Sequence, residues 1–198
     1  MPAASPKLLG LMRWWLFFLL PLWPLAYLFL LGLNNELGAD PAKFIVDHLG
    51  TWAINMLWIT LAVTPLKHLF RWGWLLQYRR MMGLYALFYV VLHILAFATF
   101  LVGWRVDILV RELTERPYVI AGFFAFIMLI PMGITSTKAM MRRLGRRWKT
   151  IHQLIYPISL LVMLHFFWQI RSSFYEQLLY AVVLAWMLGY RLYLRKQK

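Results

Sequence analysis

MGLYALFYVVLHILAFATFLVG, residues 82–103, is the stretch that decides the fold of this chain. It runs for 22 residues without an acidic or basic side chain. A helix needs about 20 mostly apolar residues to cross the hydrocarbon core of a bilayer, so this stretch predicts a membrane-spanning helix. Its one histidine, His93, falls near the middle of the span, where an ionisable group is costly and usually functional.

The composition extends this interpretation to the whole chain. Of its 198 residues, 63% are hydrophobic and 14% are charged, and the mean hydropathy is +0.66. A soluble domain carries about 25% charged residues, and a bilayer removes the need for that polar shell. The sequence therefore predicts an all-α integral membrane protein, a single domain over 1–198 built as a bundle of about six transmembrane helices. Their expected ranges are about 14–33, 51–70, 82–103, 117–134, 151–170 and 174–194.

Charged residues alternate between two sets of connecting segments. The basic segments are the N-terminus, 66–81, 135–150 and the C-terminus, and they hold 16 of the 21 basic residues. The acidic segments are 34–50, 104–116 and 171–176, and they hold all seven acidic residues. The positive-inside rule places the basic segments and both termini in the cytoplasm. The net charge of +14 thus reflects topology, and membrane lipid rather than nucleic acid is the expected partner.

The chain contains no cysteine, which limits its chemistry. Disulfides, iron–sulfur clusters and the Cys-x-x-Cys-His attachment of c-type heme are excluded. A metal or heme would have to be held by histidine, methionine or oxygen ligands. No Gly-x-Gly-x-x-Gly or Walker loop is present, so the chain carries no recognisable nucleotide-binding domain of its own.

Two of the five histidines lie inside predicted spans. His93 comes 13 residues after Arg80, and His165 comes 16 residues after Lys149. At about 1.5 Å of rise per residue, both sit within about 5 Å of the same depth. They can therefore ligate one iron from opposite faces, since neutral imidazole suits iron where sulfur is absent. The alternative is a neutral histidine that bonds a backbone carbonyl of a neighbouring helix.

The other histidines lie nearer the membrane surfaces. His48 is expected in an outer loop and His68 at the inner end of the second helix, both as interfacial residues. His152 lies one turn inside the fifth helix, 13 residues before His165. At about 100° of rotation per residue the two would point about 140° apart. They share a face only if Pro157 alters the winding between them.

Several motifs together resemble a known family. The chain is similar to the heme-binding membrane subunit of the bacterial periplasmic protein-methionine-sulfoxide reductase system, within the ferric-reductase-like transmembrane group that includes the membrane part of NADPH oxidases. The similarity covers nearly the whole chain, and its most specific part runs from 135 to 156. The matching stretches are 37–43, 59–66, 79–84, 116–118, 135–140 and 142–156.

The resemblance implies roles for three histidines. His93 and His165 match the axial ligands of heme b, and His152 matches a ligand of a possible second heme. In the wider oxidase group the third and fifth helices each offer two histidines, whereas here the inner position on the third helix, near Arg79 and Arg80, is arginine. His152 therefore lacks its expected partner, for which His68 is a possible substitute. An arginine at that position could instead hold a heme propionate or a flavin phosphate.

The resemblance also implies partners and a location. The expected electron donor is the respiratory quinone pool or a cytoplasmic flavin reductase, with FMN as a bound cofactor. The expected acceptor is a periplasmic molybdoenzyme, the catalytic methionine-sulfoxide reductase subunit, and the acidic segments 34–50 and 104–116 are the candidate docking surface. The chain itself is then an electron-transfer subunit of an oxidoreductase system, a multi-pass protein of the bacterial inner membrane. Two alternatives remain open from the residues: a stand-alone transmembrane ferric or quinone reductase, and a small transporter whose histidines relay protons.

Overall fold

The computed structural model describes residues 6–169 and 174–197, and all regular structure in them is helical. Six helical stretches are long and apolar enough to cross a membrane, which confirms the predicted number of spans. In chain order the elements are α1 (Pro6–Leu19), η1 (Leu20–Leu22), α2 (Trp23–Leu33), α3 (Pro41–Leu69), η2 (Gly73–Gln77), α4 (Arg79–Ala96), η3 (Phe97–Val102), α5 (Val106–Glu115), α6 (Pro117–Ile134), α7 (Lys138–Leu144), α8 (Arg146–His152), α9 (Ile155–Trp168) and α10 (Tyr175–Lys196).

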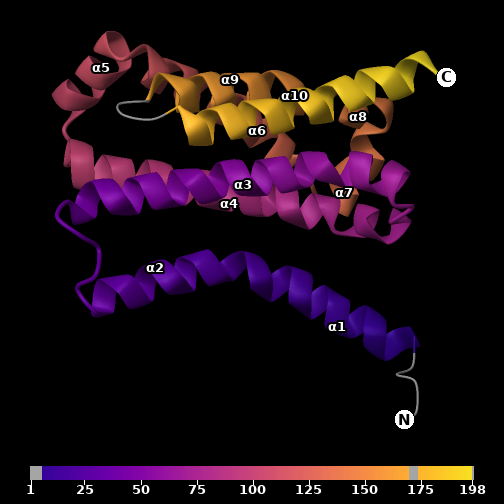
Figure 1. Ribbon diagram of the computed structural model, residues 1–198. Helices are drawn as coiled ribbons and strands as arrows, with labels where there is room; N and C mark the ends of the chain where they lie inside the picture. The colour runs from indigo at the N-terminus through magenta and orange to yellow at the C-terminus, as the bar shows by residue number, and fades with distance from the viewer. Residues whose placement is uncertain (1–5, 170–173, 198) are drawn as a thin grey trace.

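The spans run back and forth between two ends of the bundle (Figure 1). The first described residues of α1 and the last of α10 lie at one end, together with η2, α7 and α8. We call this the basic end, because it carries the basic segments of the sequence. The starts of α3, α6 and α10 lie at the opposite, acidic end, where α5 also lies (Figure 1). The alternation of charge along the chain is therefore also a separation of charge in space.

The boundaries differ from the sequence prediction in several places. The second span begins at Pro41 rather than at residue 51, because Asp40 caps the helix by accepting a hydrogen bond from Lys43 N at 3.0 Å and Pro41 occupies the first turn. His48 consequently lies within α3, and its expected place in an outer loop is wrong. The segments 104–116 and 135–150 also contain helices, namely α5 and the α7–α8 pair. The predicted end of the fifth span at residue 170, and most of the loop that follows, lie outside the described residues.

The first span bends where Pro21 and Pro24 interrupt it, and side chains of the bundle hold the bend. Proline lacks the N–H that would continue the helical ladder, so nearby carbonyls need other donors. The hydroxyl of Tyr85 donates to Phe18 O and that of Tyr89 to Pro21 O, each at 2.6 Å. His48 Nε2 donates to Pro24 O at 3.0 Å. These bonds dock the bent span onto α3 and α4.

The remaining spans pack as two antiparallel pairs, α3 with α4 and α6 with α9, and α10 lies against α3 and α9. Hydrogen bonds between side chains and backbone fix α10 on α3, as is common between membrane helices. Trp58 Nε1 donates to Tyr180 O at 3.1 Å, and the Tyr180 hydroxyl donates to Asn55 Oδ1 at 2.6 Å. The core between the pairs is apolar, and its fully buried members include Leu61, Tyr89, Ile158 and Met187.

Candidate functional site

His93 on α4 and His165 on α9 lie close together between their helices. Their ring centroids lie 6.3 Å apart, and the ring planes are at 84° to one another. The comparison of depths made from the sequence anticipated this proximity. Both histidines lie in the half of the bundle nearer the acidic end, because each contacts the first turns of a helix that starts there.

Each ring is oriented by a hydrogen bond to a backbone carbonyl. His93 Nδ1 lies 2.9 Å from Val46 O on α3, and His165 Nδ1 lies 2.6 Å from Tyr118 O on α6. A carbonyl can only accept, so each Nδ1 carries the proton and donates it. The proton-free nitrogen of each imidazole is therefore Nε2, whose lone pair is available to a metal. The side-chain amide nitrogen of Gln169 lies 3.4 Å from His165 Nε2. This amide can donate a hydrogen bond to the lone pair of that nitrogen.

A glycine makes room for each ring. Gly50 follows Val46 by one helical turn, and a Cβ atom there would lie 3.0 Å from His93 Nδ1. Gly122 follows Tyr118 by one turn, and a Cβ atom there would lie 2.8 Å from His165 Nδ1. The two histidines thus have equivalent environments. In each, a carbonyl on a neighbouring helix orients the imidazole, and a glycine one turn later leaves space for it. The sequence interpretation missed these glycines and carbonyls, because their roles depend on helix pairing.

His152 occupies a different site near the basic end. Its Nε2 lies 3.2 Å from Thr135 Oγ1 at the end of α6, and its ring lies 4.0 Å from that of Trp148. The ring beside His152 is thus an indole, not a second histidine. The helix is interrupted at Gln153 and Leu154, just before Pro157, where Leu154 N donates to Ile151 O and Tyr156 N donates to Gln153 O.

This interruption decides whether His152 and His165 lie on the same face of the fifth span. His152 contacts the last residue of the α6 region, Thr135, and His165 contacts the first turn of α6 at Tyr118. The two histidines therefore lie along the same neighbouring helix. The change of winding that the sequence made the condition for a shared face is present just before Pro157.

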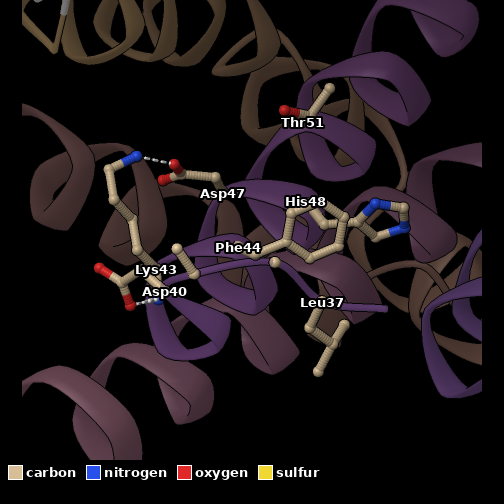
Figure 2. Close-up of a pocket in the computed structure, with 9 residues that line it drawn as sticks. Leu37, Asp40, Lys43, Phe44, Asp47, His48 and Thr51 are labelled. Atoms are coloured by element: carbon tan, nitrogen blue, oxygen red, sulfur yellow. Dashed lines mark hydrogen bonds and ion pairs between the residues drawn. The ribbon is translucent and has the colours of Figure 1, made fainter. Parts of the chain in front are cut away.

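The two remaining histidines are placed differently from the pair. His48 Nε2 bonds Pro24 O, and the ring lies 5.9 Å from Phe44 in a stacked arrangement. It lines a surface groove of about 500 Å³ at the acidic end, in which Lys43 and Asp47 form an ion pair (Figure 2). His68 is exposed near the end of α3. Within the described residues, no group of three or more His, Cys, Asp or Glu side chains could hold a metal ion.

The acidic end carries charged side chains that pair locally. On α5, Arg111 pairs with Glu115, and Glu112 pairs with Arg116 at 3.1 Å. Just before it, Arg105 Nη2 donates to Asp107 Oδ2 at 2.7 Å, and this contact lowers the pKa of the exposed Asp107 carboxyl. The acidic end therefore carries ion pairs, most of whose side chains are exposed.

The fold and the site define the class: a multi-pass helical membrane protein with a pair of imidazoles held between two spans. Residues 49–163 match the family described as "Ferric reductase like transmembrane component", and the chain belongs to this family. No solved structure matches the chain.

Curated relatives carry the name protein-methionine-sulfoxide reductase heme-binding subunit MsrQ. The protein of Xanthomonas oryzae pv. oryzae is 47% identical over 159 residues, which cover 80% of this chain and 72% of the relative. That of Xanthomonas campestris pv. campestris is 46% identical over 163 residues, covering 82% and 74%. That of Polaromonas naphthalenivorans is 40% identical over 195 residues, covering 97% and 85%.

Proposed function

We propose that this chain is a heme-containing electron-transfer subunit in which His93 and His165 are the axial ligands of one b-type heme. The observation that carries the proposal is the close pair of imidazoles, each with Nδ1 bonded to a carbonyl, which leaves each Nε2 without a proton. This hydrogen bonding is typical of histidines that ligate metals. The names of the relatives supply the identity of the cofactor.

The spacing of the rings fits one metal between them. Histidine nitrogens bind metals at about 2 Å, so two imidazoles whose ring centres lie about 6 Å apart could both reach one ion. The observed separation is 6.3 Å. A simple structural role for two neutral histidines would be met by the carbonyl bonds alone and would not require the two rings to lie this close to each other.

Heme bound here would supply one-electron transfer between the two faces of the membrane. The chain's own residues provide the setting. Val46 O and Tyr118 O orient the imidazoles and increase their basicity, and Gly50 and Gly122 leave the space that these orientations need. The surrounding apolar helices exclude water, which tunes the reduction potential.

A second heme at His152 stays a prediction, because the site offers a single histidine. The ring next to it is Trp148, and Arg79 is the charged group that acts on it. The ratio of heme to protein in the purified holoprotein tests this point. A ratio of one is expected from the His93–His165 pair alone, and a ratio of two, reduced by His152→Ala, would add the second site.

The direction of transfer and the partners are part of the same proposal. We place the basic end and both termini in the cytoplasm of a bacterium, with the chain in the inner membrane, because the basic residues gather at that end. Electrons enter from the quinone pool or a cytoplasmic flavin reductase, with FMN as a further cofactor. They leave to a periplasmic molybdenum-dependent subunit that reduces methionine sulfoxide in proteins. The MsrQ names support the link to a methionine-sulfoxide reductase.

Reoxidation by the partner tests the function. The purified holoprotein, reduced with a quinol or a flavin reductase, should return to its oxidised spectrum when the catalytic subunit and an oxidised protein substrate are both added. No reoxidation under these conditions would contradict the proposal. The family description favours one alternative, a stand-alone ferric reductase. Fast reduction of a ferric chelate without any partner would support that alternative.

A further inference from the structure

A buried arginine lies at the basic end, away from the histidine pair. Arg191 on α10 has only 7% of its surface exposed. Its Nη2 donates a hydrogen bond of 2.5 Å to Leu61 O on α3. That carbonyl needs a donor, because Pro65 lies one turn later in α3 and has no N–H to give. Arg191 therefore replaces the missing helical hydrogen bond.

This capping role does not account for the positive charge. A carbonyl needs one donor, which a neutral amide side chain could supply, whereas a guanidinium brings five N–H groups and a full charge. Nη1 of Arg191 is buried and has no hydrogen-bond partner. Burying a charge without an opposite charge is costly, so Arg191 requires an anion nearby.

The groups around Arg191 are cationic or neutral. The guanidinium carbons of Arg191 and Arg195 lie 5.8 Å and 5.5 Å from the ring centroid of Tyr156, so two cations share one aromatic ring. Arg79, at the start of α4, is a third cation in the neighbourhood of Tyr156 and Arg191. Cation–π contacts offset only part of such a concentration of charge.

No carboxylate side chain can compensate this cluster. All seven acidic residues belong to the acidic segments, at the other end of the bundle, and all seven are among the described residues. The compensating anion must therefore come from outside these side chains. Arginine clusters at a membrane surface are suited to the oxygens of phosphate groups, which they bind in bidentate fashion.

We propose that Arg79, Arg191 and Arg195, around Tyr156, form a binding site for a phosphate-type oxyanion at the basic end of the bundle. Arg195 is exposed and lies at the mouth of the site, Arg79 is half-buried, and Arg191 forms its base. The phosphate can belong to a lipid headgroup or to a water-soluble compound, since the site lies where α10 leaves the apolar core. The site goes beyond the proposed function and does not depend on heme at His93 and His165.

Thermal unfolding of the full chain in nanodiscs tests the proposal in two arms. In phosphatidylcholine discs, inorganic phosphate is titrated against chloride at equal ionic strength. In the second arm, phosphatidylglycerol replaces part of the phosphatidylcholine. The variants are Arg191→Gln, whose amide can still cap Leu61 O, and Arg79→Gln, which touches no capping bond. Arg143→Gln, an exposed arginine of α7 at the same end, is the matched control.

The unfolding midpoint of the wild-type chain and of the control should rise in at least one arm. A rise with inorganic phosphate identifies a soluble ligand, and a rise with phosphatidylglycerol alone identifies a lipid headgroup. The apparent affinity should fall about tenfold or more in Arg191→Gln and in Arg79→Gln, since one charge-assisted hydrogen bond is lost in each. An equal response of the variants and the wild type, or no rise in either arm, would overturn the proposal. The heme spectrum of the same samples is a separate readout.

Discussion

His93 and His165 are oriented by equivalent local environments on two different helix pairs. In each, the imidazole donates Nδ1–H to a carbonyl in the first turns of a neighbouring helix, and a glycine follows that carbonyl by four residues. The equivalence matters because an axial ligand must hold its nitrogen within about 0.2 Å of the ideal metal distance. Backbone atoms of a helix move less than side chains and can provide that precision.

The glycines give a prediction at the scale of single residues. Gly50→Ala and Gly122→Ala each place a methyl group within 3.0 Å of an imidazole, so the ring must move. Overpacking of this kind costs about 1–3 kcal/mol, which corresponds to a loss of about fivefold to 150-fold in heme affinity. Heme content per protein, measured by the pyridine hemochrome method, should fall in both variants.

The matched control for the glycines is Gly189→Ala on α10, where an added Cβ meets no atom within 4 Å. Its heme content should equal that of the wild type. Full heme content in Gly50→Ala and Gly122→Ala would show that the rings have space to spare and would contradict the packing argument.

The sequence predicted the two histidines of the site but not the residues that orient them. His93 and His165 stood out because histidine is rare in an apolar span, and their depths could be compared by counting from basic residues. The partner residues Val46, Gly50 and Gly122 carry no such signal. A carbonyl exists at every position, and a glycine in a membrane helix is common, so only the helix pairing shows which ones matter.

At the scale of elements, the bent first span depends on bonds from α4. Pro21 and Pro24 break the helix, and the hydroxyls of Tyr85 and Tyr89 supply donors to its carbonyls. Tyr89 has no exposed surface, so its hydroxyl and the Pro21 carbonyl are both shielded from water.

Tyr89→Phe tests that dependence. The substitution leaves a buried carbonyl without its donor, which costs about 1–3 kcal/mol. The unfolding midpoint in detergent should fall accordingly. Tyr27→Phe is the control, because Tyr27 lies on the same bent span with 45% of its surface exposed, and a change within about 0.5 kcal/mol is expected there. Equal midpoints for both variants would mean that the Tyr89 bond does not hold the bend.

The element boundaries show what a hydropathy argument omits. Hydropathy identifies apolar residues, so it predicted that the second span starts at residue 51. The helix α3 begins earlier, at Pro41, because its first turns contain polar residues and are capped by Asp40. The Asp40–Pro41 pair was a readable start signal, since aspartate is a good cap and proline suits the first turn. α5 was missed because its apolar residues are interrupted by charges, a pattern of a helix that lies at a surface.

At the scale of the whole molecule, the basic and the acidic segments lie at opposite ends of the bundle. The sequence alone predicted the number of spans and the return of the first and last described helices to one end, because hydropathy and charge alternation report on the chain directly. Orientation in the membrane rests on the same charges and stays part of the proposal. What the chain could not show by itself is the packing of α6 against α9, which depends on side-chain fit.

The acidic segments 34–50 and 104–116 are the predicted docking surface for the catalytic partner. Glu36→Gln with Glu115→Gln removes two exposed acids from these segments. The rate at which the partner reoxidises the reduced holoprotein should fall severalfold at low salt, and the difference should shrink at high salt, because steering by exposed charges is screened. Glu176→Gln, at the start of α10 and outside the segments 34–50 and 104–116, is the control. An unchanged rate in the double variant would contradict this docking surface.

The reduced-minus-oxidised absorption spectrum of the purified, heme-replete protein tests the central claim most directly. The account predicts b-type Soret and α bands in the wild type, their loss in His93→Ala and in His165→Ala, and their retention in His68→Ala, whose side chain is exposed away from the pair. Bands of full intensity in either His93→Ala or His165→Ala, or no bands in the wild type, would contradict it.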